Sequence, residues 1–121
     1  MSKYEDLDVW KLAHKLVINI YKQTKGFPAE EKYRLVDQLC RARSSIAMNI
    51  AEGSGRKTSK DFLNFLHIAR GSLQETKYQL LLSKDLEYIN DQVYEELIEE
   101  CYKIGRLLNG LINVIGGKKS D

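Results

Sequence analysis

Apolar residues recur at steps of three and four along most of the chain, which is the spacing of one face of an α-helix. The first apolar stripe lies between about residues 8 and 25, where Ala13 and Val17 widen it towards one face. Its principal members are Val9, Leu12, Leu16 and Ile20. The pattern predicts a helix over about 8–25.

Pro28 and Gly53 bracket the second apolar stripe. Proline suits the first turn of a helix because its ring fixes φ and its missing N–H would be unpaired there, and Phe27 can pack against the helix start. Glycine readily adopts the left-handed conformation that ends many helices. We therefore expect a helix over about 29–53 that stops at Gly53.

Two further helices are expected over about 59–85 and 91–115. Thr58, with Asp61 three residues later, resembles a capping box, and Asn90 is a favoured N-cap residue. Apolar residues in the last helix alternate between steps of three and four, which is typical of a helix-packing seam. They are Tyr94, Leu97, Cys101, Ile104, Leu108, Leu111 and Ile115.

No segment shows the two-residue alternation of a half-buried strand, and the connections between the expected helices are short. Helices joined by short connections pack most simply as antiparallel neighbours. The expected fold is therefore all-α, an antiparallel up-down-up-down four-helix bundle. We expect residues 1–121 to form a single domain, with a fraying tail at 116–121.

The composition is that of a globular protein. Of 121 residues, 43% are hydrophobic and 30% are charged, and the formal net charge of +2 excludes a general basic coat. The two cysteines lack a disulfide-like or metal-like spacing. No apolar run approaches the roughly 18 residues of a membrane span, and the N-terminus lacks an uninterrupted apolar signal region. We expect a soluble, cytoplasmic protein with no membrane partner.

The charges are unevenly distributed along the chain. Residues 85–100 contain seven carboxylates and no lysine or arginine, whereas residues 41–60 contain five cations and the single carboxylate of Glu52. The basic patch expected from this pattern comprises Arg41, Arg43, Arg56, Lys57, Lys60 and Arg70. The connection between the second and third helices has no aromatic residue on which a base could stack. We therefore expect binding to the backbone of RNA or DNA rather than base reading.

The alternative is an interaction scaffold. The acidic edge of the last helix and the basic patch would then meet between subunits or dock a protein partner. Charge runs also commonly form solvated faces, and acidic residues early in a helix favour its positive end. Substitutions of Arg41 and Lys57 separate the two functions, according to whether they dissolve an oligomer or abolish nucleic-acid binding.

A polar stripe borders the apolar face of the second helix. Its members are spaced by four and three residues, and the third helix offers polar groups that could face them. The expected network comprises Ser45, Asn49, Glu52, Ser72 and Glu75. We expect Glu52 to meet Arg70 and Asn49 to meet Ser72, and we favour a role in packing register over a ligand site.

Candidate catalytic groups are sparse. The loop Gly53–Ser59 is no Walker loop, because an arginine rather than a glycine precedes its lysine and a helix rather than a strand comes before it. His14 and His67 are on separate helices without a metal-binding motif, and Cys40 and Cys101 are in apolar stripes. We expect no catalytic residue, no metal and no cofactor, and an enzyme is the least favoured hypothesis.

The stretches Gln38–Gly53 and Ile68–Glu75 resemble a known family, the four-helix-bundle proteins encoded in intervening sequences of bacterial large-subunit (23S) ribosomal RNA genes. The segment Asp6–Trp10 and the pair Phe27–Pro28 resemble the same family. The resemblance covers roughly Tyr4–Ile115, and its most specific part is the motif Ser-Ile-x-x-Asn-Ile-Ala-Glu-Gly.

This resemblance implies a small bacterial bundle that assembles as a ring, a homopentamer, without known catalytic activity. The chain is also similar to the accessory protein of diversity-generating retroelements, a barrel-shaped pentamer that binds nucleic acid and a reverse transcriptase. The motif positions that carry over are Ser45, Asn49, Glu52, Gly53, Arg70, Gly71, Ser72 and Glu75. Arg43 stands where the family more often has a small residue.

Overall fold

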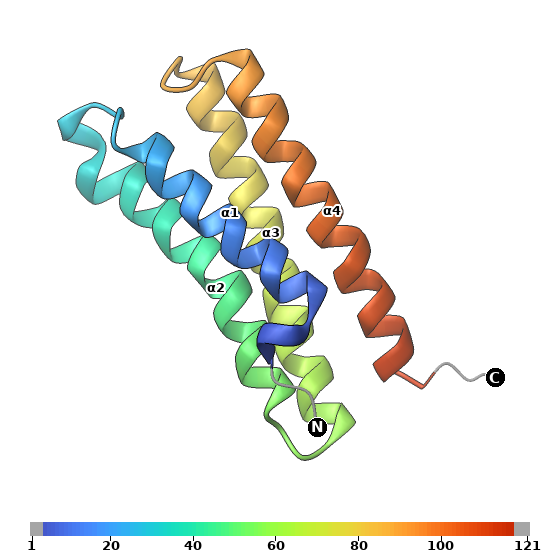
Figure 1. Ribbon diagram of the computed structural model, residues 1–121. Helices are drawn as coiled ribbons and strands as arrows, with labels where there is room; N and C mark the ends of the chain where they lie inside the picture. The colour runs from blue at the N-terminus through green and yellow to red at the C-terminus, as the bar shows by residue number, and fades with distance from the viewer. Residues whose placement is uncertain (1–3, 118–121) are drawn as a thin grey trace.

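The computed structural model describes residues 4–117, in which four long helices form a bundle (Figure 1). The helices are α1 (Asp8–Thr24), α2 (Asp37–Ser54), α3 (Ser59–Asp85) and α4 (Asp91–Ile115). Each helix runs antiparallel to the one before it, and α1 and α3 each pack against both α2 and α4. The described residues contain no strand. The expected all-α, up-down-up-down four-helix bundle is confirmed.

The segment before α2 is helical but not α-helical. A 3₁₀ helix, η2 (Ala29–Glu31), is followed by a π-helix, η3 (Lys32–Val36), and α-helical bonding begins only at Asp37. A π-turn holds an extra residue, so it rotates the faces of the residues before it relative to those after it. Apolar periodicity does not reveal this change of hydrogen bonding, and the single α-helix expected over 29–53 was wrong for its first eight residues.

The core is formed by the apolar stripes of all four helices. Its largest fully or almost fully buried members are Leu16, Ile20, Leu39, Ile46, Ile50, Leu66, Leu73, Leu80, Ile104 and Leu108. The seam expected in α4 is buried at Leu97, Cys101, Ile104 and Leu108, and its outer members are half-buried. Burial of these stripes is the main favourable contribution to the stability of the bundle.

Gly53 allows α2 and α3 to approach each other closely. A Cβ atom at Gly53 would lie 2.8 Å from Cβ of Phe65 and 2.9 Å from Cδ1 of Phe62. Gly53 lies inside α2, which ends at Ser54, and the C-cap residue Gly55 has a φ of −89°. The expected left-handed stop at Gly53 was therefore wrong, because the glycine is required by packing and not by a turn.

Helices α3 and α4 each begin with a side-chain N-cap. Thr58 Oγ1 accepts a hydrogen bond from the backbone N–H of Asp61 at 3.1 Å, and Asn90 Oδ1 accepts one from Val93 at 2.7 Å. Both expected N-caps are confirmed. The two caps fix the points at which α3 and α4 leave the turns.

The α3–α4 turn is joined to the start of the α2 segment. The hydroxyl of Tyr88 donates a hydrogen bond to Glu31 in η2 at 2.6 Å, and the ring of Tyr88 lies 5.3 Å from that of Phe27. The hydrogen bond to the Glu31 carboxylate raises the pKa of Tyr88, because the carboxylate stabilises the protonated phenol. Glu87, in the same turn, has a φ of 66°, which is uncommon for a residue other than glycine.

Across residues 4–117, no helix is sufficiently long and apolar to cross a membrane. The tail expected to fray begins at Gly116, and its residues 118–121 lie outside the described part of the chain.

Candidate nucleic-acid interface

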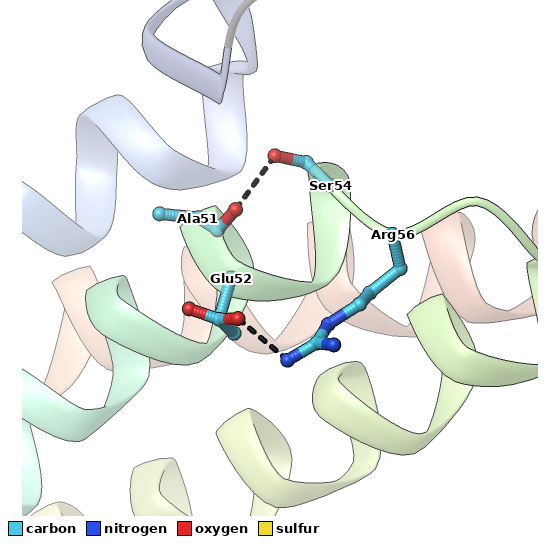
Figure 2. Close-up of polar contacts among 4 residues, drawn as sticks. All are labelled: Ala51, Glu52, Ser54 and Arg56. Atoms are coloured by element: carbon cyan, nitrogen blue, oxygen red, sulfur yellow. Dashed lines mark hydrogen bonds and ion pairs between the residues drawn. The ribbon is translucent and has the colours of Figure 1, made fainter.

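Three of the expected basic residues, Arg56, Lys57 and Lys60, are exposed around the α2–α3 turn at one end of the bundle (Figure 1). Arg56 donates from Nη2 to Oε2 of Glu52 at 2.6 Å, one helical turn away (Figure 2). Its guanidinium also lies 4.7 Å from the centre of the Phe65 ring. Among residues 4–117, neither Lys57 nor Lys60 forms an ion pair.

The helix end that presents these cations is held by local hydrogen bonds. The hydroxyl of Ser54 donates to the backbone carbonyl of Ala51 at 2.9 Å, which satisfies one of the last carbonyls of α2 (Figure 2). Figure 2 shows Arg56 reaching back over this last turn to Glu52. The turn therefore presents two lysines without an ion pair in residues 4–117 and one arginine that is already paired. Asp61, which follows Lys60, is also exposed.

Arg41 is far from that turn. It precedes Arg56 by fifteen residues, about 22 Å along a helix axis, and it pairs with Asp37 at 3.1 Å. Both side chains of this pair are substantially exposed, so the pair contributes little to stability. Arg41 therefore does not belong to one patch with Lys57 and Lys60.

Arg43 is fully buried, and its place in the expected basic patch was wrong. It follows Leu39 by four residues and precedes Ile46 by three, so it occupies the core-facing stripe of α2. Its guanidinium carbon lies 3.6 Å from the centre of the Tyr21 ring, and Nε, Nη1 and Nη2 have no hydrogen-bond partner in the described residues. Arg43 cannot contact a phosphate on the surface of this fold.

Arg70 faces α4 and not the α2–α3 turn. Its Nη1 donates to Oδ1 of Asn109 at 3.1 Å, and Nη2 lies 3.0 Å from Nδ1 of His67. It lines a groove of about 200 Å³ between α3 and α4, together with Lys77 and Arg106. The sequence did not single out Lys77 and Arg106, because they lie outside the basic window at 41–60.

The acidic residues lie at the other end of the molecule from Lys57 and Lys60. Helix α3 begins beside the basic turn and ends at Asp85, and the acidic residues continue into the first half of α4 (Figure 1). Among them, Glu100 is half-buried and accepts two hydrogen bonds from Asn19 of α1 at 2.9 and 3.1 Å. Lys22, Lys25 and Lys84 lie at the same end as these acidic residues, and Asp61 follows Lys60 at the other end, so each end carries charges of both signs.

A second groove lies between α1 and α2 and is mainly apolar. One part, of about 310 Å³, is lined by Trp10, His14 and Val17, and an adjoining part of about 440 Å³ is lined by Tyr21. Ser44 and Met48 belong to both parts. The Trp10 and His14 rings are stacked with centres 5.0 Å apart. The sequence assigned Arg41 to the basic patch and Ser45 and Asn49 to the polar network, but it did not indicate a groove here.

Both cysteines are free thiols that differ in burial. Burial raises the pKa of Cys101 to about 12, so its thiol stays protonated at neutral pH. Cys40 is a half-buried free thiol. No group of three or more His, Cys, Asp or Glu residues among positions 4–117 could hold a metal ion.

Comparison with known proteins decides the family. The family model described as 23S rRNA-intervening sequence protein matches residues 5–110. The chain belongs to this family. A solved structure similar to this 23S rRNA-intervening sequence protein is a protein of unknown function from the S23 ribosomal protein family of Bacteroides thetaiotaomicron, with 30% sequence identity and a TM-score of 0.80. The match covers 86% of this chain and 97% of that chain. No curated protein matches.

In this member of the 23S rRNA-intervening sequence protein family, the motif in α2 forms a polar network with α3. The hydroxyl of Ser72 donates to Oγ of Ser45 at 2.8 Å, and Nδ2 of Asn49 donates to the carbonyl and Oγ of Ser45 at 2.8 and 2.9 Å. The expected contact between the two helices therefore exists, but Asn49 binds Ser45 and not Ser72.

The charged members of the motif do not join this network. Glu52 pairs with Arg56, so the expected contact with Arg70 was wrong, and Glu75 is exposed. Arg70 faces α4, because it lies on a different side of α3 from Ser72. Helical spacing alone does not show which of two neighbouring helices a side chain faces.

Proposed function

We propose that this protein is a non-enzymatic, homo-oligomeric helical bundle that binds the backbone of RNA or DNA. The observation that carries the proposal is the α2–α3 turn, where Lys57 and Lys60 are exposed without an ion pair in residues 4–117. When unpaired surface cations neutralise phosphates, they release the counterions condensed on the nucleic acid. This release is the main source of affinity in backbone binding.

The candidate contacts are local to the α2–α3 turn. Both ends of the bundle carry charges of both signs, with Asp61 beside Lys60 at one end and Lys22 and Lys25 near the acidic residues at the other. The contacting set is smaller than the sequence indicated, because Arg43 is buried and Arg41 and Arg56 are paired with carboxylates. Weak sequence preference follows from contacts to phosphate alone.

The test is a titration of labelled RNA and DNA, followed by fluorescence anisotropy at about 50 and about 200 mM salt. The double variant Lys57→Gln with Lys60→Gln should reduce the slope of log affinity against log salt by roughly 0.7–0.9 for each phosphate that the protein no longer neutralises. Lys22→Gln with Lys25→Gln is the matched control, because it removes the same charge at the far end of the bundle. Salt-independent binding, or no binding, would refute the proposal.

The oligomer in this proposal is the ring, a pentamer, that the sequence resemblance implies. The apolar α1/α2 groove supports it, because Met48 and Tyr21 expose 67% and 53% of their surface in a single chain. Exposed large apolar side chains gathered along one groove are typical of a face covered by another protein. We propose that a second copy covers it.

The second candidate function is a scaffold in which the charges serve assembly or dock a protein partner. Arg41 supports it, because this residue lines the same groove as Tyr21 and Met48. Arg41→Gln and Lys57→Gln separate the two functions, since the residues lie in different parts of α2 and its following turn. Loss of the oligomer in both variants would favour assembly, whereas a normal oligomer with weakened nucleic-acid binding in Lys57→Gln would favour the first proposal.

We propose no catalytic role and no cofactor, and a cytoplasmic location. The raised pKa of Cys101 argues against a thiolate nucleophile at that position. Both cysteines are free thiols, which suits a reducing compartment.

A further inference from the structure

The groove between α3 and α4 gathers three cations that the α2–α3 turn does not include. Arg70 and Lys77 come from α3 and Arg106 from α4, and Tyr102 lies beside them. We propose that this groove binds single-stranded nucleic acid, with the cations on phosphates and a base stacked on Tyr102. The inference rests on the proposed function and adds to it a preference for single strands over duplexes.

The charge of the groove is not compensated locally. No aspartate or glutamate of the described residues lines it. Glu100 precedes the groove residue Cys101 in the chain, but its carboxylate is held on the α1 side by Asn19. A groove whose charged lining residues are all cations concentrates polyanions, because low-dielectric walls strengthen its potential.

Two side chains other than carboxylates contact the Arg70 guanidinium. It is held by Asn109 at 3.1 Å and His67 at 3.0 Å, and neither contact is to a carboxylate. A guanidinium positioned in this way keeps its charge and its remaining N–H donors for an oxyanion. Lys77 follows Arg70 by seven residues, about 10 Å along the helix and on the same face, so the two cations are spaced along the groove.

Tyr102 supplies a surface on which a base can stack. Half of its surface is exposed, and Nζ of Lys77 lies 5.1 Å from the centre of its ring. The ring attracts the lysine through its π face, and base stacking on an aromatic ring tolerates any sequence. Bases in a duplex are already stacked and paired, so this contact is available only to a single strand.

The groove is too small to enclose a drug-sized molecule. Its volume of about 200 Å³ is below the ~300–1,000 Å³ of pockets that enclose small ligands. Gly105 forms part of its wall, where an added Cβ would lie 3.5 Å from Cδ2 of Leu73. The absence of a side chain at Gly105 leaves this space open.

The first arm of the test measures the ratio of single-strand to duplex affinity. Fluorescence anisotropy is recorded with a labelled single-stranded RNA and with a hairpin duplex of the same length. Tyr102→Ala should lower the ratio roughly 5- to 150-fold through the loss of one stacked base, and Tyr102→Phe, which keeps the ring, should restore it. Tyr78→Ala is the matched control, because Tyr78 is a 60% exposed tyrosine of α3 that does not line the groove.

The second arm tests the cations. Lys77→Gln with Arg106→Gln should reduce the salt slope for single-stranded RNA by about 0.7 for each phosphate left without its cation. Lys11→Gln with Lys15→Gln removes the same charge from the exposed surface of α1 and should give a smaller change. Thermal unfolding of each variant, followed by circular dichroism, confirms that the bundle is intact.

The outcomes separate this inference from the proposed function. Equal effects of Tyr102→Ala and Tyr78→Ala on the affinity ratio would overturn the proposal that the groove binds single strands. A salt slope unchanged by the Lys77 and Arg106 substitutions would overturn it too. If Lys57 and Lys60 still governed binding in that case, the proposed function would stand alone. Failure of both RNA forms and of the DNA in the earlier titration to bind would overturn the two proposals together.

Discussion

At the scale of single residues, Arg43 is the least expected feature of the fold. A charged group removed from water without hydrogen bonds loses several kcal/mol of hydration, and stacking on Tyr21 returns only about 0.5–2 kcal/mol. The bundle therefore tolerates Arg43 at a net cost to its stability. Its apolar stem still fills core volume beside Leu39 and Ile46.

Arg43→Met should stabilise the protein, because methionine fills a similar space without a charge. We expect the free energy of unfolding, measured by urea denaturation, to rise by about 1–3 kcal/mol. Lys103→Met, on the exposed surface of α4, should change it by no more than about 0.5 kcal/mol. A loss of stability in Arg43→Met would show that the guanidinium makes favourable contacts that this fold does not display.

At the scale of elements, the close approach of α2 to α3 shapes one end of the bundle. Gly53 packs directly against Phe62 and Phe65, and the Ser45–Ser72 hydrogen bond joins the same two helices further along. Together these contacts fix the axial register of α2 against α3, which places Lys57 and Lys60 at the tip. The axial register of α2 against α3 thus sets the position of the candidate interface.

Gly53→Ala should destabilise this helix pair. Alanine inside a helix normally gains about 0.5–1 kcal/mol over glycine, but here its Cβ would lie under 3 Å from Cβ of Phe65, which cannot rotate away. We expect a net loss of about 1–2 kcal/mol in the free energy of unfolding. Gly71→Ala in α3 is the control, since nothing lies within 4 Å of its added Cβ, and it should stabilise. Stabilisation by both variants would contradict the packing role of Gly53.

The sequence predicts these elements well because their signals are local. Apolar spacing and the caps at Thr58 and Asn90 depend on residues within a few positions of one another. The π-helix at Lys32–Val36 and the packing role of Gly53 depend on contacts between helices, which periodicity does not record.

The candidate site was harder to predict for the same reason. Proximity in the chain suggested one basic patch, whereas the fold separates Arg41, buries Arg43 and turns Arg70 towards α4. The groove cations Lys77 and Arg106 come together only when two antiparallel helices pack. Their proximity depends on which helices are neighbours, and helical spacing within one segment does not show this.

At the scale of the whole molecule, two grooves of different character flank the bundle. The α1/α2 groove is apolar and contains Met48, whereas the α3/α4 groove is lined by Arg70, Lys77 and Arg106. Because the two grooves lie between different helix pairs, covering the first in an oligomer does not require occupation of the second. Assembly and binding are therefore separable by substitution.

Met48→Glu should dissolve the proposed oligomer, because an unpaired carboxylate buried in an apolar interface is costly. We expect the mass measured by size-exclusion chromatography with light scattering to fall to that of one chain, 14.0 kDa. Tyr33→Glu introduces the same charge at an 83% exposed side chain outside the groove and should leave the mass unchanged. A wild-type mass of one chain, or an intact oligomer in Met48→Glu, would contradict the assembly through this face.

The stacked pair of Trp10 and His14 gives the molecule a built-in optical reporter. The chain has a single tryptophan, and it forms part of the wall of the α1/α2 groove. Its indole emission therefore shifts to shorter wavelength when water is expelled from that wall. A dilution series read at this one fluorophore would follow the joining of subunits without any label.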